Sequence, residues 1–299
     1  MDTIKQLNNK FRISDRLIFR EMENNLASIV ISNSFADALI SLYGGQVVSF
    51  KPKEELDLLY MSPLSNFKIG KAIRGGIPVC FPWFGPHPTD QSKPQHGFGR
   101  LMTWKVFQTS ERQNGETEIT LILGSSDETK QYWANDFFAE LTILVGKKLS
   151  VSLKITNSGA APLNYSCALH SYYHVSDITN ISILGLNKTP FYKHGQSGNF
   201  IQNTPKLVFN QMEDRHYYNT EETCLIEDPT FKRTIKVSKS GSKITTVWNP
   251  WIEDCASIAD LPDDGYRSFV CIEAVNSFDD SISLNPGESH TTAAYLEIS

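Results

Sequence analysis

Apolar residues follow a period of two most clearly over residues 139–155. Within this stretch they occupy alternate positions of two runs, 139–145 and 149–155, separated by the turn sequence Gly-Lys-Lys. Alternation of this kind places the apolar side chains on one face of a β-strand. The stretch therefore predicts an antiparallel hairpin with one buried face.

Shorter runs of the same kind recur along most of the chain. They predict strands within residues 27–32, 36–50, 116–127, 165–173, 181–185, 243–248, 268–275 and 291–298. Helical periodicity is confined to two short segments, residues 1–10 and 251–258. Many strands without alternating helices favour antiparallel sheets packed as a sandwich. We predict an all-β fold with a few short helices. Because no linker-like stretch divides residues 1–299, we expect one domain.

Composition narrows the range of partners. The 299 residues include 28 basic and 33 acidic ones, a net charge of −5, which offers no broad basic surface for nucleic acid. The chain has no run of 18 apolar residues, and its N-terminal stretch lacks the apolar core of a signal peptide. Five cysteines, set mostly in apolar runs, are typical of buried free thiols. We expect a cytoplasmic monomer that binds neither membrane nor nucleic acid.

The segment 73–88 is rich in proline and glycine, and Arg74 is its one charged residue at neutral pH. Prolines fix φ and glycines adopt conformations closed to other residues, so such a loop can present a side chain rigidly. A second segment ends in Arg100, shortly after Gln95 and His96. Two neighbouring guanidiniums suit the oxygens of a phosphate. The alternative is that each arginine binds a backbone carbonyl or a surface carboxylate.

His170 and His174 lie four residues apart on one face of a predicted strand. Two imidazoles in this arrangement suggest a metal site, but no third ligand follows at a recurrent spacing. We therefore expect no bound metal. A single histidine in a strand is most often a core or rim residue with no chemical role.

Two carboxylates stand out by their surroundings. Glu273 lies in the apolar run FVCIEAV, where burial of an ionised carboxylate is costly unless it is paired. Glu273 either has a structural role, with its charge paired by a neighbouring group, or it has a functional role. In the second case burial raises the pKa of its carboxyl group, which suits a general base. Asp214 is followed directly by Arg215, and two tyrosines lie a few residues further along the chain. It is predicted either to form a salt bridge in a solvated loop or to accept a sugar hydroxyl beside a stacking aromatic ring.

Six motifs in register resemble a known family. They are GKAIRGGIPVCFPWFGPH, QHGFGR, LHSYYHVSDI, EDRHYYNT, VWNPW and CIEAVN. In this order they resemble the hexose-6-phosphate mutarotases (glucose-6-phosphate 1-epimerases) of the aldose 1-epimerase, or galactose-mutarotase-like, superfamily. The resemblance runs from about residue 36 to the C-terminus and leaves residues 1–25 as an N-terminal extension.

The resemblance implies a large antiparallel β-supersandwich with the active site on its concave face. It implies that the protein opens and recloses a hexopyranose ring without a cofactor, and that His170 and Glu273 are the catalytic residues. The two arginines are expected at the 6-phosphate of a phosphosugar substrate. The substrate-binding residues expected in all are Arg74, Gln95, His96, Arg100 and Asp214.

The chemistry of ring opening fits these residues. A proton must leave the C1 hydroxyl and another must reach the ring oxygen, which Glu273 as base and His170 as acid can supply. Histidine suits the acid role because its ordinary pKa lies near neutrality. Two alternatives stay open, an aldose 1-epimerase for unphosphorylated sugars and a non-catalytic sugar-binding β-sandwich. The paired arginines argue against the first, and the presence of both catalytic residues argues against the second.

Overall fold

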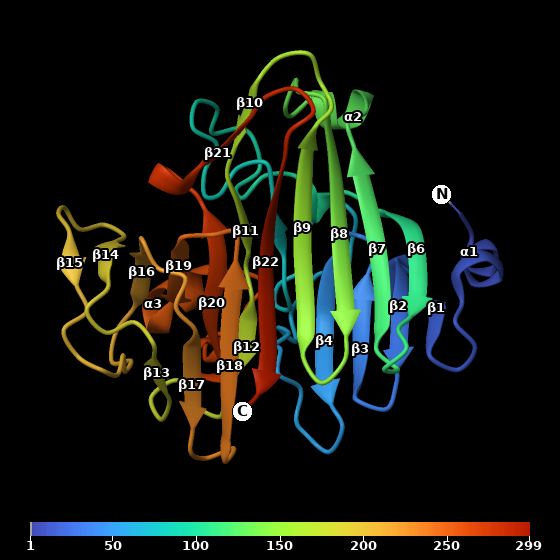
Figure 1. The fold of residues 1–299 in the computed structure, drawn as a ribbon. Helices are drawn as coiled ribbons and strands as arrows, with labels where there is room; N and C mark the ends of the chain where they lie inside the picture. Colours follow the sequence, from blue (N-terminus) through green and yellow to red (C-terminus); the bar gives the residue numbers. More distant parts are fainter. Residues whose placement is uncertain (1) are drawn as a thin grey trace.

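The period-two stretch forms the predicted hairpin, β8 (Phe137–Val145) and β9 (Leu149–Asn157), in the computed structural model, which describes residues 2–299 (Figure 1). Leu141 and Leu153 pair across it, and both are buried because they face the core. The hairpin belongs to an eight-stranded sheet with the order β13-β17-β18-β22-β9-β8-β7-β6. The other strands of this sheet are β6 (Lys105–Glu111), β7 (Thr117–Gly124), β13 (Ser182–Leu184), β17 (Cys224–Asp228), β18 (Arg233–Ser240) and β22 (Ser289–Ile298).

A second eight-stranded sheet holds most of the residues singled out from the sequence. Its order is β15-β14-β16-β19-β20-β11-β5, and β12 also pairs with β20. The strands are β5 (Val79–Cys80), β11 (Cys167–Leu169), β12 (Tyr172–His174), β14 (Pro190–Lys193), β15 (Phe200–Ile201), β16 (Glu213–Tyr217), β19 (Ile244–Asn249) and β20 (Phe269–Asn276).

Two smaller sheets and short helices complete the fold. The four-stranded sheet contains β1 (Leu17–Glu21), β2 (Ala27–Ser32), β3 (Ala36–Ser41) and β4 (Gln46–Pro52), and the two-stranded sheet contains β10 (Leu163–Tyr165) and β21 (Ile282–Leu284). The α-helices are α1 (Ile4–Phe11), α2 (Asp127–Lys130) and α3 (Trp251–Ser257). Helix α1 buries Leu7 and Phe11, and β1 pairs with β2. Residues 4–21 therefore pack onto the rest of the fold.

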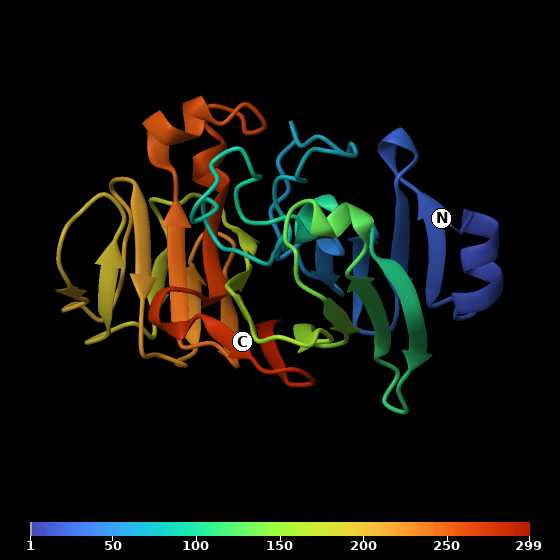
Figure 2. The ribbon, with the colours of Figure 1, turned by 90° about the horizontal axis from the view of Figure 1, so that it is seen from above.

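The sheets are arranged in layers. In Figure 1 the sheet containing β8 and β9 lies in front, and the four-stranded sheet and the β16–β20 sheet lie side by side behind it. Figure 2 shows the same layering from above, with the loops of residues 53–100 rising on the side away from the front sheet. One large cluster of buried apolar residues includes side chains from all of these sheets. This arrangement confirms the predicted all-β supersandwich.

The predicted helices near residues 1–10 and 251–258 are confirmed, but two local predictions are wrong. The strand predicted over 165–173 is interrupted at His170 and Ser171. The alternative in which Asp214 lies in a solvated loop is also wrong, because Asp214 lies within β16. That strand carries polar residues on both faces, so it lacks the alternation by which a half-buried strand is recognised.

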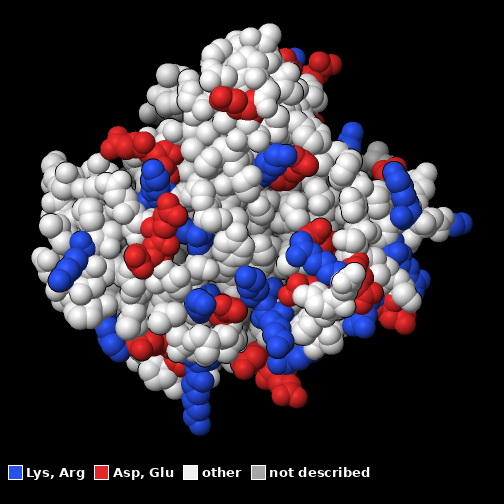
Figure 3. All heavy atoms as spheres, viewed as in Figure 1, with Lys and Arg blue, Asp and Glu red and all other residues white. Residues whose placement is uncertain are grey.

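The α-helices are short, and charges of both signs are mixed on the face of the molecule seen in Figure 1. Among the helices of residues 2–299, none is long and apolar enough to cross a membrane. Figure 3 shows basic and acidic side chains interspersed over the face seen in Figure 1, without a broad basic area on that face. The distribution agrees with the small net charge of −5.

Candidate active site

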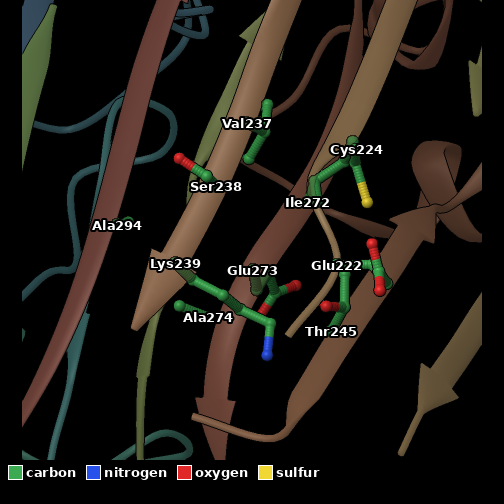
Figure 4. Close-up of a pocket in the computed structure, with 10 residues that line it drawn as sticks. All are labelled: Glu222, Cys224, Val237, Ser238, Lys239, Thr245, Ile272, Glu273, Ala274 and Ala294. Carbon is green, nitrogen blue, oxygen red and sulfur yellow. The ribbon is translucent and has the colours of Figure 1, made fainter. Parts of the chain in front are cut away.

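Glu273 lies in the middle of β20, whose eight residues are all buried. Successive side chains of a strand point to opposite faces, so Cys271 and Glu273 share one face, and Ile272 and Ala274 share the other. Ile272 and Ala274 line a small pocket between the two eight-stranded sheets, with Lys239 on the facing strand β18 (Figure 4). The pocket thus lies on the face of β20 that carries Ile272 and Ala274. The Glu273 carboxylate contacts His170 on the opposite face.

His170 lies where the chain passes from β11 to β12. Its backbone N–H donates to the carbonyl of Pro78 over 3.1 Å, and the N–H of Tyr172 donates to the carbonyl of Gly76 over 2.9 Å. Gly76 has a φ of +62°, and a Cβ there would lie 2.2 Å from the carbonyl oxygen of Val47. Only glycine fits this close approach. The proline- and glycine-rich segment therefore holds the backbone around His170 in place through hydrogen bonds, a role that the sequence did not indicate.

The imidazole and the carboxyl group face each other. His170 Nε2 lies 3.4 Å from Glu273 Oε1, and the two side chains are 9% and 1% exposed. The remaining polar atoms, His170 Nδ1 and Glu273 Oε2, are buried and have no hydrogen-bond partner among residues 2–299. Buried polar atoms normally have partners. Two orphaned atoms at one place indicate a site that a polar ligand completes.

Burial shifts the proton affinities of the pair in opposite directions. It lowers the pKa of His170 to about 3, with further lowering by the charges of Arg100 and Arg74. It raises the pKa of Glu273 well above its ordinary value, and the charge of Asp214 raises it further. The expectation that His170 titrates near neutrality is therefore wrong for the free protein. Burial therefore favours a neutral imidazole at His170 and the protonated form of Glu273.

Arg74 and Arg100 both lie close enough to His170 for their charges to lower its pKa. Arg74 Nε donates to Asp260 over 3.0 Å, and its Nη1 donates to the hydroxyl of Tyr172 over 3.1 Å. Arg100 Nη2 donates to the carbonyl of Gln95 over 2.8 Å, and its buried Nε has no partner among residues 2–299. The alternative, in which each arginine binds a carboxylate or a backbone carbonyl, therefore accounts for some of the N–H donors. Each guanidinium also has N–H donors that make no hydrogen bond to the described residues.

Gln95 and His96 differ in how closely they approach the pair. The Gln95 side chain is exposed and makes no hydrogen bond within the described chain. His96 adopts a φ of +63°, and its ring centroid lies 5.6 Å from that of His170, edge to face. Its Nδ1 accepts a hydrogen bond from the N–H of Gly85 over 3.1 Å. Burial, followed by the charge of Arg100, lowers the pKa of His96 well below its usual value, so its ring is neutral.

Asp214 lies on β16 and does not pair with Arg215. Arg215 points to the other face and binds Glu213 through two donors, Nε at 2.6 Å and Nη2 at 2.7 Å. Asp214 Oδ1 instead lies 3.2 Å from Nε2 of His216. The reading of an Asp–Arg salt bridge is therefore wrong, because neighbouring residues of a strand face opposite ways. The charge of Asp214 raises the pKa of Glu273, so this carboxylate lies near the pair formed by His170 and Glu273.

His170 and His174, whose spacing suggested a metal site, have different neighbours. The His174 ring packs 5.3 Å from the ring of Phe231. The potential ligand atoms near His170 belong to Cys271 and Glu273, and the three lie within 4.8 Å of one another. Cys271 therefore supplies the third candidate ligand that the sequence spacing did not reveal. A His, Cys and carboxylate set suits a zinc ion chemically, so independence from metal stays a prediction.

Several further residues surround the pair without having been singled out. The Tyr172 ring stacks on His170 with centroids 4.9 Å apart, and Trp248 meets His170 edge to face at 5.9 Å. Tyr172 lies two residues after His170, a spacing that places it on the same face. Asp260, which binds Arg74, carried no sequence signal because it comes from a loop far along the chain. The whole arrangement can bind a polar ring and move protons on and off its oxygens.

Comparison with known proteins assigns the family. Residues 27–295 match the aldose 1-epimerase family. Relatives from Salmonella typhimurium and Escherichia coli, both named "Putative glucose-6-phosphate 1-epimerase", are 35% and 34% identical to this chain over 259 and 257 residues. The alignments cover 87% and 86% of this chain, and 86% and 85% of the two relatives.

A solved structure extends the likeness to three dimensions. The crystal structure of the Salmonella typhimurium protein YeaD, described as a "putative mutarotase", superposes with a TM-score of 0.89 at 31% identity. The superposition covers 97% of this chain and 95% of that one. The sequence and fold comparisons agree, and the chain belongs to the aldose 1-epimerase family.

Proposed function

We propose that this aldose 1-epimerase family member is a hexose-6-phosphate mutarotase, which interconverts the α and β anomers of glucose 6-phosphate. The observation that carries the proposal is the buried 3.4 Å contact between His170 and Glu273, with one orphaned polar atom on each side chain. Such a pair fits a ligand whose hydroxyl and ring oxygen exchange protons. The names of the Salmonella and Escherichia relatives support the same reaction.

In the proposed reaction the pair moves two protons in opposite directions. Glu273 takes the proton of the C1 hydroxyl, the bond between C1 and the ring oxygen breaks, and His170 gives a proton to the ring oxygen. The open-chain aldehyde then rotates about its C1–C2 bond, and reclosure on the other face reverses both transfers. The pair ends with the protons it began with. The scheme uses these two side chains alone.

The substrate itself prepares His170 for the acid role. In the free protein, burial, followed by the charges of Arg100 and Arg74, lowers the pKa of His170, and burial favours the protonated form of Glu273. We place the 6-phosphate at the free donors of Arg74 and Arg100. A phosphate dianion there offsets the two positive charges and raises the pKa of His170. It also raises the pKa of Glu273, which the charge of Arg100 lowers in the free protein, and the 3.4 Å contact lets the proton move between the two groups.

The remaining substrate contacts come from three residues around the pair. Asp214 approaches from β16 and offers a carboxylate oxygen to a sugar hydroxyl. His96 presents its neutral ring beside His170. Gln95 is exposed next to it and has a free side-chain amide. These positions support a polar substrate held between the β16–β20 sheet and the loop that ends at Arg100.

The cysteines support a reducing compartment. All five are free and buried, as the sequence predicted. Free thiols of this number persist where disulfides are kept reduced. We therefore place the protein in the cytoplasm.

Magnetisation exchange in NMR tests the function directly. Anomer exchange of glucose 6-phosphate and of glucose is measured with and without the protein at equal concentrations. The expected result is a large acceleration for glucose 6-phosphate and a much smaller one for glucose. Equal acceleration of both sugars identifies the alternative, an aldose 1-epimerase for unphosphorylated sugars. Binding without acceleration of either identifies the non-catalytic sugar-binding alternative.

A further inference from the structure

Asp214 is held by a histidine that the sequence did not single out. Asp214 and His216 share one face of β16, and His216 Nε2 lies 3.2 Å from Asp214 Oδ1. The other carboxylate oxygen, Oδ2, makes no hydrogen bond to any of residues 2–299, and the Asp214 side chain is 22% exposed. One oxygen of the carboxylate is therefore committed within the protein, and the other is available to a ligand.

The imidazole of His216 is also fixed on its far side. Its Nδ1 lies 2.8 Å from the hydroxyl oxygen of Thr246, the residue opposite His216 in the pairing of β16 with β19. Both residues are buried. The ring is flanked by Phe278 at 5.2 Å and Phe84 at 6.2 Å between centroids. A contact at each nitrogen and an aromatic ring on two sides leave the imidazole little freedom to turn.

For an ionised Asp214 and a neutral His216, one arrangement of protons fits this series of groups. An ionised carboxylate accepts hydrogen bonds and donates none, so the proton between the two residues belongs to His216 Nε2. In a neutral imidazole Nδ1 then accepts, and the Thr246 hydroxyl donates to it. Burial lowers the pKa of His216, against the opposing charge of Asp214, which favours this neutral form. In this state the contacts at the two ring nitrogens favour the tautomer of His216 with its proton on Nε2, directed at Asp214 Oδ1.

We propose that His216 is a positioning residue for substrate recognition, which keeps Asp214 ionised and oriented so that Oδ2 accepts a hydrogen bond from one hydroxyl of the sugar. The inference rests on the proposed function, in which Asp214 contacts the substrate. Without His216, Asp214 loses its 3.2 Å contact with Nε2, and burial favours the protonated carboxyl group, because it raises the pKa of Asp214. A protonated or rotated carboxyl group is a poorer acceptor for that hydroxyl.

The test removes the hydroxyl and the histidine separately. Anomer exchange is measured for glucose 6-phosphate and for its 2-, 3- and 4-deoxy analogues, with wild type, His216→Leu and Asp214→Asn. In wild type we expect one analogue to have a kcat/KM about 10- to 100-fold lower, the loss of one hydrogen bond to a charged group. In His216→Leu this difference is expected to shrink to within about threefold, because the parent sugar loses the same bond and its KM rises.

Two matched variants separate positioning from general damage. His216→Gln keeps an N–H donor and is expected to recover much of the discrimination. His194→Leu changes another histidine whose charge affects Asp214 but whose side chain does not bind it, and it is expected to behave as wild type. Nitrogen-15 NMR of the free protein is expected to show His216 as the neutral tautomer with its proton on Nε2. In Thr246→Val that tautomer is expected to lose its dominance.

The outcomes distinguish this inference from the function on which it rests. If His216→Leu keeps the full deoxy discrimination while Asp214→Asn loses it, the role of His216 is wrong and the proposed function stands. A uniform fall in kcat/KM for all analogues would also overturn the role, because it indicates structural damage alone. If wild type exchanges the anomers of none of these sugars, the proposed function fails, and the tautomer measurement still tests the geometry of His216.

Discussion

At the scale of single residues, the site depends on two groups whose proton affinities are displaced toward each other. His170 becomes a weaker base on burial and Glu273 a weaker acid, so the pair shares one transferable proton over a wide pH range. The strand pattern around Glu273 predicted its burial. The lowered pKa of His170 was not predicted, because it requires burial of the imidazole, its largest cause, and the charges of arginines that are 96 and 70 residues away along the chain.

Removal of either member of the pair tests the catalytic assignment. Glu273→Gln and His170→Asn preserve size and polarity, so we expect both variants to fold and to lose about 10²–10⁴-fold in kcat, the usual contribution of a positioned acid or base. The loss is measured by anomer exchange, with circular dichroism and thermal unfolding as controls for the fold. A folded variant that keeps a near wild-type rate contradicts the assignment.

The shared proton also sets the pH dependence. Activity requires one proton on the pair, so kcat/KM is expected to fall below about pH 3, where His170 is also protonated, and to fall again above the raised pKa of Glu273. The negative charge of Asp214 contributes to that raised pKa. In Asp214→Asn the alkaline limb should therefore move to lower pH. The two enzymes are compared on the same substrate, which cancels its own ionisation, and an unmoved limb contradicts the coupling.

The cysteine beside the pair makes metal dependence a question worth testing. The scheme needs no metal, so exhaustive treatment with a strong chelator is expected to leave the rate of anomer exchange unchanged. Metal analysis of the untreated protein accompanies the assay. A stoichiometric zinc whose removal abolishes activity, and whose return restores it, would assign the cluster of His170, Cys271 and Glu273 to a metal.

At the scale of elements, the site is assembled from one regular strand and several irregular segments. The strand β20 was predicted because residues 269–275 are apolar except for Glu273. The strand β16 was missed because both of its faces are polar, and the break at His170 was missed because 165–173 alternates as a continuous strand would. The family resemblance placed the site residues where pattern alone could not, since the contacts among them join distant loops.

The loop containing Arg74 and the segment ending at Arg100 are expected to act mainly on substrate binding. The 6-phosphate does not change during ring opening, so contacts to it stabilise the ground state and the transition state equally. Arg74→Ala or Arg100→Ala should raise KM for glucose 6-phosphate about 10- to 100-fold, with little change in the slow turnover of glucose. Equal losses on both sugars would make these arginines structural, as the contact of Arg74 with Asp260 allows.

At the scale of the whole molecule, the site joins parts of the chain that are far apart in sequence. Arg74 and Arg100 come from the loops beside the sheets, His170 and Glu273 from the middle of the second large sheet, and Asp214 from β16 near its edge. A substrate that contacts all of them binds only the folded arrangement. Binding should therefore stabilise the native protein against unfolding by mass action.

Glucose 6-phosphate is accordingly expected to raise the unfolding temperature. At a concentration 100 times Kd, the gain in free energy is about 2.7 kcal/mol, which corresponds to about 4 °C for a chain of this length. Glucose at the same concentration should give a much smaller shift. In Arg74→Ala and Arg100→Ala the shift with glucose 6-phosphate should fall toward that of glucose, because the phosphate contributes little there. Inorganic phosphate should stabilise wild type weakly and neither variant. If glucose 6-phosphate stabilises both variants as strongly as wild type, its phosphate is bound elsewhere. The proposed effect of the phosphate charge on the pKa of His170 would then also be wrong.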